Sequence, residues 1–152
     1  MGNPVLGTNV LCQVGILVHD IEKTGKEWAA FLGVEPPVVQ ITGDIHEAQT
    51  KYNGEPSEAR SKLAFFNVGD NVTVELIEPD KNPASTWRQA LDANGEGFHH
   101  IAFMIKGMKE KIEICGKAGF KLVQTGEYAG GRYAYIDATE KLKVMLELLE
   151  ND

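Results

Sequence analysis

The chain has 152 residues, of which 43% are hydrophobic, and its 22 acidic and 15 basic side chains give a net charge of −7. This length is typical of one domain with a real core, and the acidic balance argues against nucleic acid as a partner, because phosphate binding requires clustered Lys and Arg. The two cysteines lack a CxxC spacing and no apolar run approaches the ~20 residues of a membrane helix, so we expect one cytoplasmic domain over residues 1–152 with reduced thiols.

The first half of the chain predicts a βαβββ module over about residues 9–80. Asp20 is well placed to cap a helix, and Gly33 supplies its left-handed end. Gly69-Asp70-Asn71 separates two apolar runs and predicts a hairpin. The polar stretch 43–60 is predicted to be a long loop, either a lid or a mobile segment. The expected strands are 10–18, 38–41, 63–68 and 72–77, and the expected helix is 20–32.

A connecting helix over about 83–95 and a second βαβββ module over about 97–150 are predicted to follow. Pro83-Ala84-Ser85 begins the connecting helix, and Gly130-Gly131 predicts a turn. The expected elements of this module are strands at 98–105, 120–125, 132–136 and 144–149 and a helix at 108–117. The predicted fold class is therefore α+β, with two tandem βαβββ modules that jointly close one cavity.

The two halves repeat one another in sequence. Residues 14–18 (VGILV) resemble residues 101–105 (IAFMI), which aligns Gln13 with His100. The ends of the halves also match, as residues 75–78 (ELIE) and 147–150 (ELLE). A potential ligand therefore occurs on the first and last strands of both halves.

Strand alternation places these polar residues on one face of the predicted sheet, because neighbours along a strand point to opposite sides. Branched residues of the first and fifth strands share a face that is expected to pack under the helices. The opposite face carries a polar residue beside a small one, Gly15 or Ala102, which leaves room for a cavity. The side chains expected to converge are Gln13, Glu75, His100 and Glu147.

One imidazole, one amide oxygen and two carboxylates form a ligand set that suits a divalent ion such as Zn, Ni, Co, Mn or Mg. Two buried glutamates of like charge are unfavourable in apolar strands, and a bound cation removes that penalty. The alternative is that each glutamate faces solvent. Four symmetry-matched positions favour the metal site.

The remaining histidines and the cysteine beside Gln13 receive other interpretations. Alternation places His99 on the helix-facing side with Ile101, as a hydrogen-bonded supporting residue. His19 and His46 are expected to be solvated loop residues. Cys12 is expected to face away from the cavity and has no evident base, so nucleophilic catalysis is not expected.

Several segments resemble methylmalonyl-CoA epimerases, namely 95–103 (GEGFHHIAF), 74–79 (VELIEP), 85–94 and 145–149 (MLELL). On these residues the chain resembles the vicinal oxygen chelate superfamily, which also contains glyoxalase I, extradiol dioxygenases and bleomycin-binding proteins. The resemblance covers nearly the whole chain. It implies a cupped mixed sheet around a metal bound by the first and fourth strands of each module. It also implies a homodimer, which long apolar strands with uncovered edges favour independently.

Two positions depart from the epimerase pattern. Epimerases typically have histidine at the position of Gln13, and the order Gln, Glu, His, Glu is the set of eukaryotic-type glyoxalase I. Some epimerases carry a second acid on the third strand, whereas residues 61–66 (SKLAFF) contain none.

The resemblance implies an enzyme that removes the α-proton of 2-methylmalonyl-CoA or a related acyl thioester. Glu147, or Glu75, is the expected base, and His100 remains a ligand. Arg132 and Tyr133 or Tyr135 are expected near the cavity rim, either to hold a carboxylate or phosphate of the substrate or as ordinary surface residues. A glyoxalase I-type isomerisation of a hemithioacetal is the alternative, and a metal-free cup that binds a small ligand without catalysis is another.

Overall fold

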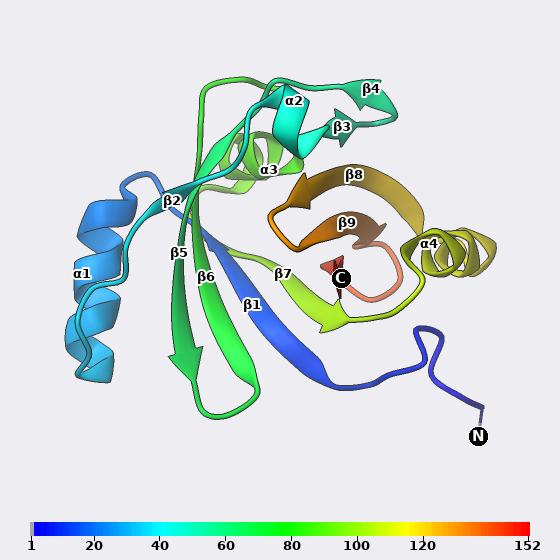
Figure 1. The fold of residues 1–152 in the computed structure, drawn as a ribbon, viewed down its shortest axis with the longest axis horizontal. Coiled ribbons are helices and arrows are strands. Elements are labelled where there is room, and N and C mark those ends of the chain that lie inside the picture. The colour runs from blue at the N-terminus through cyan, green and yellow to red at the C-terminus, as the bar shows by residue number, and fades with distance from the viewer. Residues whose placement is uncertain (1) are drawn as a thin grey trace.

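Residues 2–152, the part of the chain that this computed structural model describes, form ten strands and four helices (Figure 1). The helices are α1 (Ile21–Leu32), α2 (Ile45–Ala48), α3 (Thr86–Asn94) and α4 (Met108–Lys117). The strands are β1 (Leu11–Leu17), β2 (Gln40–Ile41), β3 (Lys51–Tyr52), β4 (Glu55–Pro56), β5 (Ser61–Val68), β6 (Val72–Pro79), β7 (Gly97–Met104), β8 (Lys121–Tyr128), β9 (Gly131–Ala138) and β10 (Val144–Asn151). None of the helices within the described residues is long and apolar enough to span a membrane.

All strands belong to one curled mixed sheet in the order β2-β5-β6-β1-β7-β10-β9-β8-β3-β4. The first strands of the two halves, β1 and β7, pair antiparallel at its centre. Each of them pairs on its other side, in parallel, with the last long strand of its own half, β6 or β10. Outward from its centre the sheet therefore has the same order of four strands on both sides, with β3 and β4 added beyond β8 on the second side. This order confirms the predicted α+β class with two tandem βαβββ modules.

The helices cover different faces of the sheet. Helix α1 lies outside the first half and α4 outside the second (Figure 1). The expected cap of α1 is present, since the Asp20 carboxylate accepts from the backbone N–H of Lys23 at 3.0 Å and Gly33 has φ 68°. Helix α3 instead packs inside the cup, where Trp87 and Leu91 contact inward-facing residues of both halves.

The burial pattern confirms the predicted alternation along the regular strands. Ile16 and Val18 pack in the outer cluster with Ile21 of α1, whereas Leu17 packs in the inner cluster with Trp87 of α3. The same alternation separates outer from inner residues on the other central and ligand-bearing strands.

Residues 43–60 form an ordered strap rather than the irregular loop that was expected. The strap contains α2, β3 and β4, and it crosses to the other half, where β3 pairs with β8 (Figure 1). The backbone N–H of Asn53 donates to the carbonyl of Val123 at 2.8 Å, and Ser57 Oγ donates to the carbonyl of Ala84 at 2.6 Å. These bonds fix the strap to the second module and to the start of α3.

The two edge strands of the sheet, β2 and β4, are only two residues long each. Edge strands this short offer few unpaired backbone groups for pairing with another chain. The homodimer consequently stays a prediction that rests on the family resemblance, and light scattering at micromolar concentration would measure it.

Gly15→Ala should destabilise the protein, because a Cβ at Gly15 would lie 2.0 Å from Cε1 of the His100 ring. Displacing a packed ring costs typically ~1–3 kcal/mol. Urea unfolding measures the loss. Gly25→Ala is the matched control, since its Cβ would meet nothing within 4 Å in the middle of α1. That change should stabilise the helix by about 0.5–1 kcal/mol. Equal stabilities of the two variants would contradict this account of Gly15.

Candidate metal centre

The pairing register brings the four predicted side chains together around two small residues. Gly15 of β1 pairs with Glu75 of β6 on one side and with His100 of β7 on the other. Ala102 of β7 pairs with Gln13 and with Glu147 of β10 in the same way. The missing Cβ of Gly15 provides the space that the His100 ring occupies. Small residues at these two positions therefore make the convergence possible.

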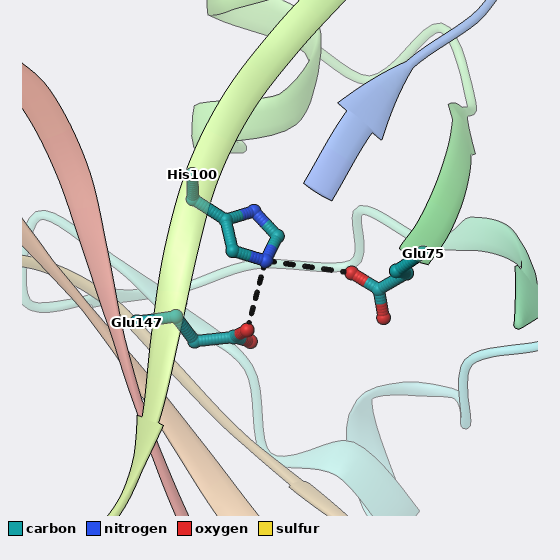
Figure 2. A group of neighbouring side chains, drawn as sticks. All are labelled: Glu75, His100 and Glu147. Atoms are coloured by element: carbon teal, nitrogen blue, oxygen red, sulfur yellow. Dashed lines mark ion pairs between the residues drawn. The ribbon is translucent and has the colours of Figure 1, made fainter. Parts of the chain in front are cut away.

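His100 Nε2 is the common contact of the cluster. It lies 2.9 Å from Glu147 Oε2, 3.1 Å from Gln13 Oε1 and 3.7 Å from Glu75 Oε1. Figure 2 shows the imidazole and both carboxylates pointing toward one another from three strands. His100, Glu75 and Glu147 each offer a ligand atom within 4.8 Å of the others. These three residues and Gln13 are all buried.

The two carboxylates are buried with unsatisfied oxygens. Among the described residues Glu75 Oε1 and Glu147 Oε2 have no hydrogen-bond partner; the 2.9 Å contact of Glu147 Oε2 with His100 Nε2 lacks hydrogen-bond geometry. Burial, followed by the charge of Glu147, raises the pKa of Glu75 well above its ordinary value of 4.5. Buried anionic oxygens without donors are expensive unless a cation or a proton neutralises them. The oxygen and nitrogen donors present fit a divalent ion.

The second glutamate of each repeated ExxE segment has a different role. Glu78 Oε2 accepts from the backbone N–H of Ile21 at 3.0 Å, at the start of α1. Glu150 Oε2 accepts from the N–H groups of Gly107 and Met108 at the start of α4. Residues three apart on a strand face opposite sides, so each segment sends one carboxylate to the centre and one to a helix N-terminus, where negative charge is favourable.

His99 lies on the inner side of the sheet, so its predicted place on the face of Ile101 is wrong, whereas the expected hydrogen-bonded position is confirmed. Strand β7 has a bulge here, because Gly15 pairs with His100 while the next residue of β1 pairs with Phe98. The extra residue re-aims the side chain. His99 Nδ1 lies 3.0 Å from His100 Nδ1, and Nε2 lies 3.3 Å from Thr86 Oγ1. Burial lowers the pKa of His99 to about 3, with a further contribution from His100, so the ring is neutral.

The other residues interpreted from the sequence are not part of the cluster. Cys12 occupies a second bulge, just before Gln13, and its thiol donates to the carbonyl of Ala102 at 3.3 Å. Burial, followed by the charge of Glu147, raises the pKa of this thiol, which disfavours the nucleophilic thiolate. His19 and His46 are exposed, although His46 lies in α2 rather than in a loop.

A cavity of about 820 Å³ opens beside the cluster. Its wall includes the expected Tyr133 and Tyr135 together with Trp87 from α3. Tyr135 OH accepts from Trp87 Nε1 at 2.9 Å, and Tyr133 OH accepts from Gln124 Nε2 at 3.1 Å. Burial raises the pKa of both tyrosines, which therefore remain neutral. The remaining lining residues that bear on chemistry are Gln13, Glu47, Thr50, Arg60, Glu75, Glu127 and Glu147.

Arg132 does not line this cavity. Its guanidinium donates to Glu150 at 2.9 Å and also pairs with Asp152 and Glu127, which ties β9 to the end of the chain. Arg60 is instead the one cationic residue among those lining the cavity, within the described part of the chain. Sequence alternation could not find it, because the position of Arg60 depends on where the strap crosses the cup.

Comparisons with known proteins agree with this fold. A profile of the Glyoxalase/Bleomycin resistance protein/Dioxygenase superfamily matches residues 12–136. The uncharacterized protein YqjC of Bacillus subtilis (strain 168) is 31% identical over 145 residues, which cover 93% of this chain and 92% of that protein.

Two solved structures superpose with TM-scores of 0.66. Hypothetical protein BH1468 from Bacillus halodurans C-125 is 22% identical, with 93% of this chain and 94% of the other covered. Methylmalonyl-CoA epimerase from Mycobacterium tuberculosis is 19% identical, with 100% and 93% covered. Streptomyces coelicolor methylmalonyl-CoA epimerase in complex with 2-nitronate-propionyl-CoA has a TM-score of 0.60 at 22% identity, with 94% and 97% covered. At these identities the structural likeness shows the fold.

Above about pH 6.5 the metal-free protein should lose stability as pH rises; below that pH, His99, whose pKa burial lowers to about 3, contributes a change in the opposite direction. A carboxyl whose folded-state pKa is raised stabilises the fold fully below its unfolded pKa, and this contribution is lost as pH rises through the folded pKa. For Glu75 the loss begins near the ordinary value of 4.5 and continues upward. Zn²⁺ should reverse it, because binding favours ionised carboxylates and stabilises only the folded chain. Urea unfolding across this pH range, with a chelator or with Zn²⁺, measures both effects.

Two variants control for the assignment to Glu75. Glu75→Gln should flatten the pH dependence of the metal-free protein, since it removes the titrating group. Glu113→Gln, on the exposed surface of α4, should keep the wild-type profile. A metal-free Glu75→Gln protein with an unchanged pH profile would show that another group is responsible.

Proposed function

This chain belongs to the glyoxalase/bleomycin resistance protein/dioxygenase superfamily, and on that premise we propose that it is a metal-dependent epimerase of an acyl thioester such as methylmalonyl-CoA. The observation that carries the proposal is the pair of buried carboxylates at the wall of a cavity, Glu75 and Glu147, each with one oxygen that has no hydrogen-bond donor among the described residues. The fold shared with methylmalonyl-CoA epimerases supports the substrate class.

The residues supply a ligand set and a base at the same place. A divalent ion held by the four clustered side chains would act as a Lewis acid toward a carbonyl oxygen of the substrate. We propose that the Glu147 carboxylate accepts the proton from the carbon next to that carbonyl, which leaves an enolate. Return of a proton to the opposite face of this carbon gives the epimer. His100 stays a ligand, because its ring is fixed between two strands and His99.

An epimerase needs a proton donor for the opposite face. The inward-facing residues of β5 that line the cavity, Leu63 and Phe65, are apolar, so this strand supplies none. The strap brings Glu47 to the cavity instead, and we propose it as the donor. Arg60, on the same strap, is the group we expect to hold a carboxylate or phosphate of the substrate, in place of Arg132.

Glyoxalase-type isomerisation of a hemithioacetal is the second candidate. Gln13 favours it, because its side-chain oxygen lies 3.1 Å from His100 Nε2 and so belongs to the cluster, as in the glutamine-containing ligand set of glyoxalase I. In this reaction the proton that Glu147 removes returns to the neighbouring carbon, and no second acid is required.

Glu147→Gln should abolish most solvent-deuterium exchange at the α-carbon of methylmalonyl-CoA, because general-base catalysis commonly contributes ~10²–10⁴-fold. Proton NMR in D₂O measures the exchange rate. Glu75→Gln should weaken metal binding more than Glu147→Gln does. Glu47→Gln separates proton removal from proton return, since this variant should keep deuterium exchange and lose inversion at the α-carbon. Glu113→Gln should leave both rates unchanged.

The outcomes distinguish three functions. Exchange with inversion in the wild-type protein supports the epimerase. Exchange without inversion contradicts the epimerase while sparing proton abstraction, and turnover of the hemithioacetal of methylglyoxal and glutathione then supports the isomerase. A protein that exchanges neither substrate and purifies without a stoichiometric metal would instead be a non-catalytic binding protein.

A further inference from the structure

A chain of buried hydrogen-bonding groups leads from the metal cluster to helix α3. His100 Nδ1, the ring nitrogen that points away from the carboxylates, lies 3.0 Å from His99 Nδ1. The other nitrogen of His99 lies 3.3 Å from Thr86 Oγ1. The backbone N–H of Thr86 donates to Gln124 Oε1 at 2.8 Å. The His99 ring therefore connects a ligand on β7 to α3.

We propose that His99 is a positioning residue, which accepts a hydrogen bond from Nδ1–H of His100 and so holds the neighbouring ring with the lone pair of Nε2 toward the metal. The inference rests on the metal-binding part of the proposed function. It is independent of the substrate and of the reaction.

With a metal on His100 Nε2, hydrogen-bond valence dictates the direction of the chain. A neutral imidazole carries one N–H and one lone pair, and a metal takes the lone pair. If His100 presents the lone pair of Nε2, its proton is on Nδ1 and must be donated to His99 Nδ1. His99 then carries its own proton on Nε2 and donates it to Thr86 Oγ1. With a metal on Nε2 this is the arrangement of protons that satisfies all three groups, whereas without a metal Nε2–H of His100 donates to Gln13 Oε1 and the direction of the chain reverses.

The bulge in β7 is the structural reason that two adjacent histidines can meet. In a regular strand the side chains of residues 99 and 100 would point to opposite faces. The extra residue brings the His99 ring inward, where it lies perpendicular to the His100 ring with centroids 5.2 Å apart. The ring also packs edge-on against Tyr135, with centroids 5.4 Å apart.

Helix α3 fixes the far end of the chain. Thr86 is the first residue of α3, and Ser85 caps the helix by accepting from the N–H of Arg88 at 3.0 Å. The next residue, Trp87, donates to Tyr135 OH at 2.9 Å. A hydrogen bond within the helix and hydrogen bonds to β8 and β9 of the second half thus hold the helix start that orients His99. A hydrogen-bonded partner of this kind typically improves metal affinity by 10–100-fold.

Two nearly isosteric substitutions separate hydrogen bonding from packing. His99→Leu fills a similar space but removes the acceptor. His99→Asn replaces Nδ1 with an amide oxygen that can still accept from His100. Co²⁺ titration of the metal-free protein, followed by visible absorption, gives the affinity, and competition with a chelator gives that of Zn²⁺. We expect about 10–100-fold weaker binding for His99→Leu. We expect His99→Asn to retain most of the wild-type affinity. Circular dichroism verifies that both variants fold.

Two results would overturn the proposal. One is a His99→Leu protein that binds Co²⁺ as tightly as the wild type. The other is equal weakening by leucine and asparagine, which would show that packing of the imidazole is what matters.

Nitrogen-15 NMR of the histidine rings tests the tautomers without any substitution. In Zn²⁺-loaded wild-type protein, His100 should carry its proton on Nδ1 and His99 on Nε2. A proton on His99 Nδ1 would contradict the proposed direction. None of these measurements involves a substrate. If the epimerase assays fail while the metal affinities and tautomers are as expected, the proposed function is refuted and the positioning role of His99 stands.

Discussion

The structure depends on two buried carboxylates that face each other where its two halves meet. Glu75 and Glu147 offer ligand oxygens that lie within 4.8 Å of one another, and each has an oxygen without a hydrogen-bond donor. Two like charges about 5 Å apart repel by on the order of 3 kcal/mol at an effective dielectric constant of ~20. A proton or a cation must therefore lie between them. The imidazole nitrogen of His100 and the amide oxygen of Gln13 lie at the same point. Both are metal-ligand atoms, which favours a cation.

Duplication explains how such a cluster arises from ordinary strands. Each half contributes one small residue at the centre of the sheet and one ExxE segment at its end. The first glutamate of the segment faces the cup, and the second caps the helix outside it. The same element thus positions a candidate ligand and anchors the layer that covers the sheet. Apolar clusters on both faces of the strands hold this arrangement in register.

The features predicted correctly from the sequence are those that depend on regular strand geometry. Period-two alternation and internal repetition identify Gln13, Glu75, His100 and Glu147 as neighbours, and the structure places them in contact. Alternation failed at His99, where a bulge adds one residue and reverses the face. No local pattern signals that bulge, because it arises from the pairing of β7 with β1.

The strap also could not be predicted from sequence patterns. Strands of two residues, such as β3, have too little periodicity to be recognised, and their partner is a strand from the other half. The positions of Glu47 and Arg60 at the cavity wall follow from that crossing, and so they could not be inferred from their polar surroundings. Arg132 was expected at the cavity rim, but three carboxylates already pair with it, and the sequence pattern does not indicate these ion pairs.

The central claim is that one divalent ion binds where the carboxylates of Glu75 and Glu147 meet His100. Anomalous diffraction at the zinc absorption edge, from crystals grown with equimolar Zn²⁺, tests it most directly. The account predicts a single peak per chain, about 2.0–2.2 Å from His100 Nε2 and from an oxygen of each glutamate. A structure without a peak there, in which the two carboxyl groups share a proton, would contradict it.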